Sequence, residues 1–130
     1  MISGVLQDWT TQQANSNLLV ASIIQGESGY LDLAEYDDLI LYLDVREFTP
    51  AGGSVSISYE TAVSRDDASF VAMAPPITIA AATTPVVTRI LAAYAPVPLA
   101  RYVRWHFTTS GRGVWDVCFR ITYAAYAPGA

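Results

Sequence analysis

The sequence predicts an all-β protein: a single antiparallel β-sandwich, jelly-roll-like with about eight strands, and with extended N- and C-terminal arms. Apolar and polar residues alternate over several short runs, which is the period of a strand with one buried face. Clusters of glycine, proline, aspartate and serine separate these runs, as is typical of sandwich proteins. No segment keeps the 3.6-residue period of an amphipathic helix.

The clearest alternation occupies two runs near the C-terminus, residues 101–108 and 114–123. Their inward residues are apolar: Val103, Trp105, Phe107, Trp115, Val117, Phe119, Ile121 and Tyr123. Their outward residues are mostly polar: Tyr102, Arg104, His106, Thr108, Asp116, Cys118, Arg120 and Thr122. The linker 109–113 is short and holds two glycines, which predicts that the two strands pair as a hairpin. Opposite charges on the outward faces would stabilise a solvated sheet by about 0.2–1 kcal/mol per pair.

Seven further strands are expected before this pair, over residues 18–24, 30–33, 39–46, 55–63, 70–73, 77–79 and 86–91. The two most regular of them should bury Leu39, Leu41, Leu43 and Val45, and Val55, Ile57, Tyr59 and Thr61. Turn residues fill the gaps at 25–29, 34–38, 49–53 and 64–67. Pro75-Pro76 excludes a central strand at that point, and a proline-containing segment, 94–98, is expected as an extended link.

These elements predict an N-terminal arm over residues 1–16, a sandwich domain over residues 17–123 and a C-terminal tail over residues 124–130. The arm mixes a few apolar residues with polar ones and has no clean period. It carries Trp9, and a terminal arm with a tryptophan often docks on its own domain or on a neighbour.

Five residues are candidates for contacts with a partner. Aromatic side chains near the chain ends can serve as anchors, and outward arginines can complete a polar interface. The candidates are Trp9, Tyr123, Tyr126, Arg104 and Arg120.

Composition limits the classes of function. The chain is 52% hydrophobic and 15% charged, so we expect a partner to cover part of its apolar surface. The net charge of −5 argues against binding nucleic acid or an anionic membrane. No apolar stretch approaches the roughly 20 residues of a membrane-spanning helix. The first residues lack the basic and apolar regions of a secretion signal.

No residue set predicts catalysis, a metal or a cofactor. His106 is the only histidine and Cys118 the only cysteine, so neither has partners at metal-ligand spacing and no internal disulfide can form. His106 is expected at the surface or at an interface. The pairs Asp37-Asp38 and Asp66-Asp67 do not follow the spacing of a calcium loop, and backbone turns explain them. We therefore expect a protein that is not an enzyme.

The overall layout resembles small β-sandwich proteins encoded among the structural genes of tailed bacteriophages and prophages. The resemblance covers about residues 17–123 and is carried by residues 31–33, 36–44, 54–61, 60–67, 69–70 and 101–104. It implies a non-enzymatic virion structural protein that decorates or cements the capsid and is assembled in the host cytoplasm. The implied partners are the major capsid protein or other virion subunits, together with further copies of the chain.

A second resemblance leads to an alternative function. Residues 100–109 and 115–123 resemble the closing strands of discoidin-type, galactose-binding-like jelly rolls. This resemblance implies a carbohydrate-binding module on a virion or cell surface, with a sugar site in the loops, where Tyr36, Tyr94 and Tyr126 could lie. Discoidin domains often close their ends with a disulfide, which a single cysteine cannot form.

Overall fold

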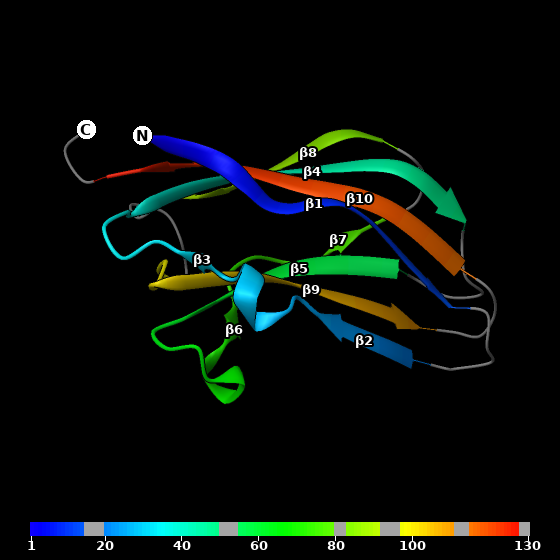
Figure 1. Ribbon diagram of the computed structural model, residues 1–130, viewed down its shortest axis with the longest axis horizontal. Coiled ribbons are helices and arrows are strands. Elements are labelled where there is room, and N and C mark those ends of the chain that lie inside the picture. The colour runs from blue at the N-terminus through cyan, green and yellow to red at the C-terminus, as the bar shows by residue number, and fades with distance from the viewer. Residues whose placement is uncertain (15–19, 50–54, 80–82, 92–96, 111–114, 128–130) are drawn as a thin grey trace.

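The computed structural model describes residues 1–14, 20–49, 55–79, 83–91, 97–110 and 115–127. Within these ranges the chain forms ten strands and two short 3-10 helices. The strands make two antiparallel sheets, which Figure 1 shows as two stacked layers, with the start of β1 and the end of β10 at the same end of the molecule. The predicted all-β sandwich is confirmed.

The two sheets differ in how continuous their strands are. The four-stranded sheet has the order β1 (Ile2–Ala14), β10 (Trp115–Tyr126), β4 (Asp38–Thr49) and β8 (Thr83–Ile90). The second sheet has the order β2 (Val20–Ile24), β9 (Tyr102–Ser110), β5 (Val55–Ala62) and β6 (Val71–Ala72), with β3 (Leu31–Asp32) beside β9 and β7 (Ile77–Thr78) beside β5. The helices η1 (Glu27–Gly29) and η2 (Asp67–Ser69) lie in the connections.

Both edges of the second sheet are broken strands. β2 and β3 pair with the same strand, β9, and β6 and β7 pair with the same strand, β5. When each broken edge is counted once, the ten strands become eight, in two sheets of four. Two packed four-stranded antiparallel sheets of this kind form a jelly roll. The prediction of a jelly-roll-like sandwich of about eight strands is therefore confirmed.

The predicted C-terminal hairpin is wrong. β9 pairs with β2, β3 and β5, whereas β10 pairs with β1 and β4 in the other sheet. The apolar faces of the two strands meet across the interior instead of lying side by side. Trp105 contacts Phe119 edge to face at 5.2 Å between ring centroids, and Phe107 stacks on Phe119 at 6.2 Å. A short glycine linker suits a crossing between sheets as well as a hairpin, and residues 111–114 lie outside the described part of the chain.

The N-terminal segment also differs from the expected arm over residues 1–16. Residues 2–14 form β1, which pairs along its length with β10 at the edge of the four-stranded sheet. The register shifts around Leu6 and again between Gln7 and Thr10, and each shift inserts an extra residue into β1 as a bulge. These bulges explain why the sequence shows no clean period there. They leave Leu6 buried in the core.

Two further boundaries differ from expectation. The tail expected over residues 124–130 begins inside β10, which continues through Tyr126. β8 begins at Thr83 and includes Pro85, where a loop was expected. Because β8 is an edge strand paired only with β4, a proline there is tolerated without loss of an interior hydrogen bond.

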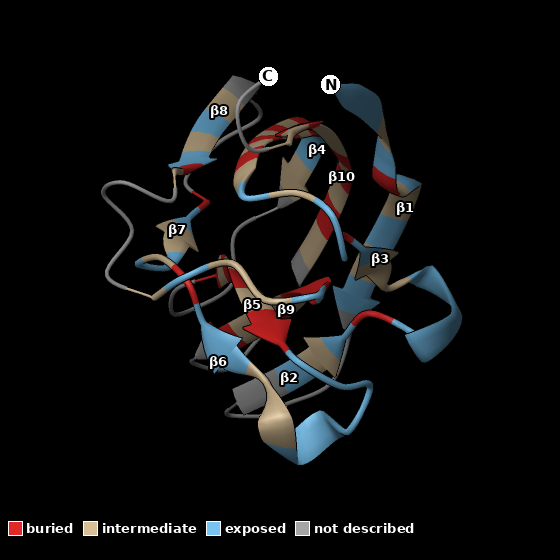
Figure 2. Cartoon of the chain, turned by 90° about the vertical axis from the view of Figure 1, so that its left-hand side faces the viewer, coloured by how far each residue is buried: buried red, intermediate tan, exposed pale blue. Residues whose placement is uncertain are grey.

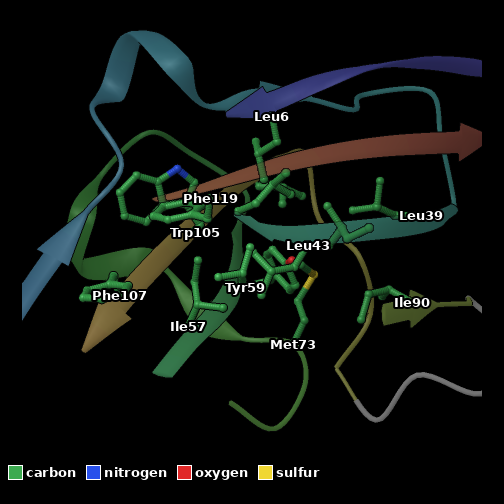
Figure 3. Close-up of a cluster of buried hydrophobic side chains, with 14 of the residues drawn as sticks. Leu6, Leu39, Leu43, Ile57, Tyr59, Met73, Ile90, Trp105, Phe107 and Phe119 are labelled. Carbon is green, nitrogen blue, oxygen red and sulfur yellow. The ribbon is translucent and has the colours of Figure 1, made fainter. Parts of the chain in front are cut away.

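The core lies between the two sheets and consists largely of the residues predicted to face inward (Figure 3). Burial is concentrated on β4, β5, β9 and β10, as Figure 2 shows, and decreases toward the edge strands. Fully or nearly buried side chains include Leu39, Leu41, Leu43, Val45, Val55, Ile57, Tyr59, Val103, Trp105, Phe107, Val117, Phe119 and Ile121.

Tyr59 is the exception in this core because it carries a buried hydroxyl. The residue is 1% exposed, and its hydroxyl has no hydrogen-bond partner among the described residues. Because an unsatisfied buried hydroxyl is costly, we expect Tyr59→Phe to raise the free energy of unfolding by about 1 kcal/mol, measured by urea denaturation at pH 7.

The same substitution should change the stability at high pH. Burial raises the pKa of Tyr59 above its ordinary value of 10.0, so above that pH the unfolded chain loses a proton that the folded chain retains. Stability therefore falls as the pH rises above about 10, and it should fall less steeply in Tyr59→Phe. A variant less stable than the original chain at pH 7 would show that the hydroxyl is satisfied.

Candidate functional site

A network of charged side chains on the outer face of the second sheet is centred on Arg104. Arg104 on β9 lies directly opposite Glu60 on β5, and its Nε donates a hydrogen bond to Glu60 Oε1 at 2.8 Å. Its Nη1 donates to Asp67 Oδ1 at 2.6 Å and to Tyr30 Oη at 2.9 Å. The residue is only 3% exposed, so this outward position is buried within the chain, whereas the sequence predicted that it faces solvent or a partner.

The segments around η1 and η2 cover Arg104. Tyr30 follows η1 and Phe70 follows η2, and their rings meet edge to face at 5.1 Å. The Arg104 guanidinium carbon lies 3.9 Å from the centre of the Phe70 ring, a cation–π contact. Arg65 Nη1 donates to the Glu27 carbonyl oxygen at 3.0 Å and so joins the two connections. The guanidinium is therefore enclosed by its hydrogen-bond partners and by the aromatic rings of the covering segments.

Hydrogen bonding keeps this buried arginine charged. Burial alone would lower the pKa of Arg104, but the hydrogen bonds with Tyr30, Glu60 and Asp67 outweigh it and raise the pKa. The neighbouring pair Arg101–Asp32 is also joined by two hydrogen bonds, of 3.1 and 3.0 Å, but both side chains are exposed. Solvent screens such an exposed pair.

The network continues from Glu60 to the edge of the sheet. Glu60 Oε2 lies 3.1 Å from His106 Nδ1, and His106 Nε2 lies 2.6 Å from Ser22 Oγ. His106 is half-buried and Ser22 is exposed. Ser22 could not be found from the sequence, because only the register of β2 against β9 brings its side chain close to His106.

A second cluster lies on the four-stranded sheet and contains two of the candidate interface residues. Trp9 packs between Arg46 and Arg120, whose guanidinium carbons lie 4.1 Å and 4.9 Å from the centre of its ring. Arg120 Nη2 donates to Asp44 Oδ2 at 3.2 Å. Trp9 and Arg46 each lie where the register shifts by one residue, and such bulges redirect side chains.

The two candidate tyrosines lie on β10. Tyr123 is half-buried against the core, and its ring lies so close to Gly4 that a Cβ there would meet the tyrosine oxygen at 2.9 Å. The carbonyl oxygen of Tyr126 accepts a hydrogen bond from the backbone N–H of Asp37 at 3.1 Å. Trp9, Tyr123, Tyr126 and Arg120 thus belong to one sheet, and Arg104 belongs to the other.

The tyrosines expected in sugar-binding loops have different outcomes. Tyr36 packs against the core, Tyr126 is a strand residue, and Tyr94 lies outside the described residues.

Gln25 is an organising residue that the sequence did not reveal. It is 4% exposed, and its Nε2 donates to the carbonyl oxygens of Leu6 and Gly29 at 2.8 and 2.7 Å. Its Oε1 accepts from the backbone N–H of Trp105 at 3.2 Å. Gln25 thereby links β1 of one sheet to β9 of the other, and all its hydrogen-bonding groups are used on the backbone, as expected of a buried amide.

The described part of the chain contains no group of three or more His, Cys, Asp or Glu residues able to hold a metal ion. The thiol of Cys118 is free and half-buried. Within the same ranges there is no helix with the length and apolarity needed to cross a membrane.

Comparison with known proteins gives a likeness in structure only. No family model matches the chain, and no curated protein matches it. A similar solved chain belongs to the structure of infectious bursal disease virus, Gx strain, with a TM-score of 0.56 and 10% sequence identity. The match covers 98% of this chain and 32% of the viral chain, so this protein spans about a third of the length of the chain it matches. The likeness shows that the chain has a β-sandwich fold also found in a virus structure.

Proposed function

We propose that this protein is a virion structural subunit that decorates or cements a phage capsid through protein–protein contacts. The observation that carries the proposal is the match of nearly the whole jelly roll to part of a chain from a virus structure. The implied partners are the major capsid protein or other virion subunits, and further copies of the chain. The structural role is fulfilled by binding and needs no chemical step.

The free edge of β1 is the contact surface that the geometry supports best. β1 is the outermost strand of its sheet and has thirteen residues, with Asp8 as its one charged side chain. It exposes Ile2 and Val5. Protein edges are usually protected by charge, proline, short length or bulges. β1 has two bulges, but the stretches on either side of them carry little charge and can accept a strand from a neighbour.

The candidate interface residues fit this proposal unequally. Trp9 lies on β1 itself, while Arg120, Tyr123 and Tyr126 lie on the adjacent strand β10. A neighbour added at the free edge of β1 would therefore pair beside Trp9, whereas Arg120, Tyr123 and Tyr126 would lie one strand further from it. Arg104 lies in the other sheet with its guanidinium already paired, so its contribution to assembly would be to hold the η1 and η2 segments in place.

The edge contact is tested by Val5→Lys, because a lysine on an edge strand opposes strand addition. Purified protein is mixed with emptied capsids of tailed phages, and co-sedimentation is measured across a concentration series. We expect saturable binding by the original chain and at least a tenfold weaker affinity for Val5→Lys. Light scattering of the free protein gives its oligomeric state in the same buffer.

The matched control is Val63→Lys, which changes an equally apolar and more exposed side chain just beyond the end of β5. It should bind like the original chain. An equal loss of capsid affinity in both variants would overturn the proposed contact at the β1 edge. Failure of the original chain to bind any of the capsids would overturn the decoration role. The carbohydrate-binding hypothesis rests on the sequence resemblance alone, and selective binding on a glycan array would favour it.

A further inference from the structure

A chain of three hydrogen-bonded side chains on the outer face of the second sheet has the arrangement of a nucleophile, a base and an orienting carboxylate. Ser22 Oγ lies 2.6 Å from His106 Nε2, and His106 Nδ1 lies 3.1 Å from Glu60 Oε2. The residues come from the adjacent strands β2, β9 and β5. Both distances lie within the range of a working nucleophile–base–carboxylate relay.

The hydrogen-bonding capacities of the groups set the direction of the relay. An ionised carboxylate only accepts hydrogen bonds, so Nδ1 of His106 carries the proton that faces Glu60. In the neutral imidazole Nε2 is then the acceptor, and the Ser22 hydroxyl donates to it. This is the tautomer in which a histidine can take the proton of a serine hydroxyl.

Glu60 is itself fixed by a second partner. Its Oε1 accepts from Arg104 Nε at 2.8 Å, which leaves Oε2 for His106. Glu60 is therefore a positioning residue, held by the arginine that the η1 and η2 segments enclose. The nucleophile end is open, because Ser22 lies on an edge strand and is exposed.

Donors for a developing oxyanion lie close to Ser22. The backbone N–H of Gln25 donates to the carbonyl oxygen of Trp105, and bonded and non-bonded pairs alternate along antiparallel strands. By this alternation Ser22 and Thr108 form a non-bonded pair, so the Ser22 N–H points to the free edge of β2. The Thr108 hydroxyl faces Ser22 across the strands and is held by Ser56 Oγ at 3.0 Å.

We propose that Ser22, His106 and Glu60 form an acyl-transfer site that hydrolyses short-chain carboxylic esters. Ile24, exposed beside His106 on the same strand face, offers an apolar contact for the acyl or alkoxy group. This activity is independent of the structural role proposed above, because it does not involve the β1 edge.

The chemical steps balance without a cofactor. Ser22 Oγ attacks the ester carbonyl carbon while its proton passes to His106 Nε2, and the alcohol leaves with that proton as the ester C–O bond breaks. Water then attacks the acyl-serine and gives a proton to His106. That proton returns to Ser22 Oγ as the carboxylic acid departs.

The test uses a fluorophosphonate probe on the full chain, with the labelled residue located by peptide mass spectrometry, and p-nitrophenyl acetate hydrolysis as a second readout. We expect labelling at Ser22, its loss in Ser22→Ala, and labelling at least 100-fold slower in His106→Gln, since a general base contributes about 10²–10⁴-fold. The exposed Ser28→Ala is the matched control and should label at the original rate.

Two outcomes would overturn the proposal. One is labelling of Ser22 no faster than of Ser28, and the other is a rate that His106→Gln leaves unchanged. Circular dichroism of each variant separates loss of the relay from loss of the fold.

Discussion

Replacing Arg104 with methionine should lower the free energy of unfolding by about 3 kcal/mol. The side chain is 4% exposed and its partner Glu60 14%, so the substitution leaves a largely buried carboxylate without its cation. Breaking a buried pair in this way costs about 3–5 kcal/mol. We expect a cost at the lower end of this range, because Glu60 keeps its contact with His106. The other carboxylate that loses its partner, Asp67, is mostly exposed to solvent. Chemical denaturation followed by circular dichroism measures the loss.

Arg101→Met is the matched control for this experiment. Arg101 lies three residues earlier and also forms a hydrogen-bonded ion pair, with Asp32, but both side chains are exposed. The denaturation midpoint should therefore stay unchanged. The double variant Arg104→Met with Glu60→Leu removes both charges and should recover most of the loss. Equal effects of Arg104→Met and Arg101→Met would mean that burial of the Arg104 pair contributes nothing to stability.

Phe119→Ala should lower the free energy of unfolding by about 3–5 kcal/mol, the range for removing a large aromatic side chain from a packed core. Phe119 is fully buried and lies on β10, while Trp105 and Phe107, whose rings contact it, lie on β9 of the opposite sheet. The substitution therefore opens a cavity at the junction of the sheets. Urea denaturation gives the free energy.

Phe48→Ala is the comparison for Phe119→Ala, because Phe48 lies in the same sheet but is only partly buried against the core. It should lose clearly less stability. If both variants lost the same amount, the aromatic contact between the sheets would not be a main source of stability.

Alternation of side chains predicted much of the fold. The inward residues of β4, β5, β9 and β10 follow a period of two, and those the structure describes are almost all buried. The alternation of apolar and polar residues indicates which face of a strand is buried, but it does not indicate which strand lies beside it. The alternation in β9 and β10 is the same whether the two strands pair within one sheet or pack face to face across the core. The sequence therefore could not distinguish these two arrangements. The bulges in β1 removed the pattern that would have revealed that strand.

The charged network was only partly visible in the sequence. The outward positions of Arg104, His106 and Glu60 followed from their places in the alternating runs. Their pairing depends on the register of β5 against β9, and the burial of Arg104 depends on the η1 and η2 segments that fold over it. Both are tertiary features. Ser22 lies in a largely apolar run with nothing to distinguish it until β2 is placed beside β9.

The pairing of β1 with β10 joins the first and the last strand of this sandwich in sequence order. While the chain is still growing on the ribosome, β1 has no partner in its own sheet, and β4 lacks one of its two neighbours. Neither gap closes until β10 (Trp115–Tyr126) has emerged. Long-range strand pairing of this kind folds slowly and leaves apolar edges exposed in the meantime. A nascent chain stalled before β10 would therefore be a natural client for a chaperone.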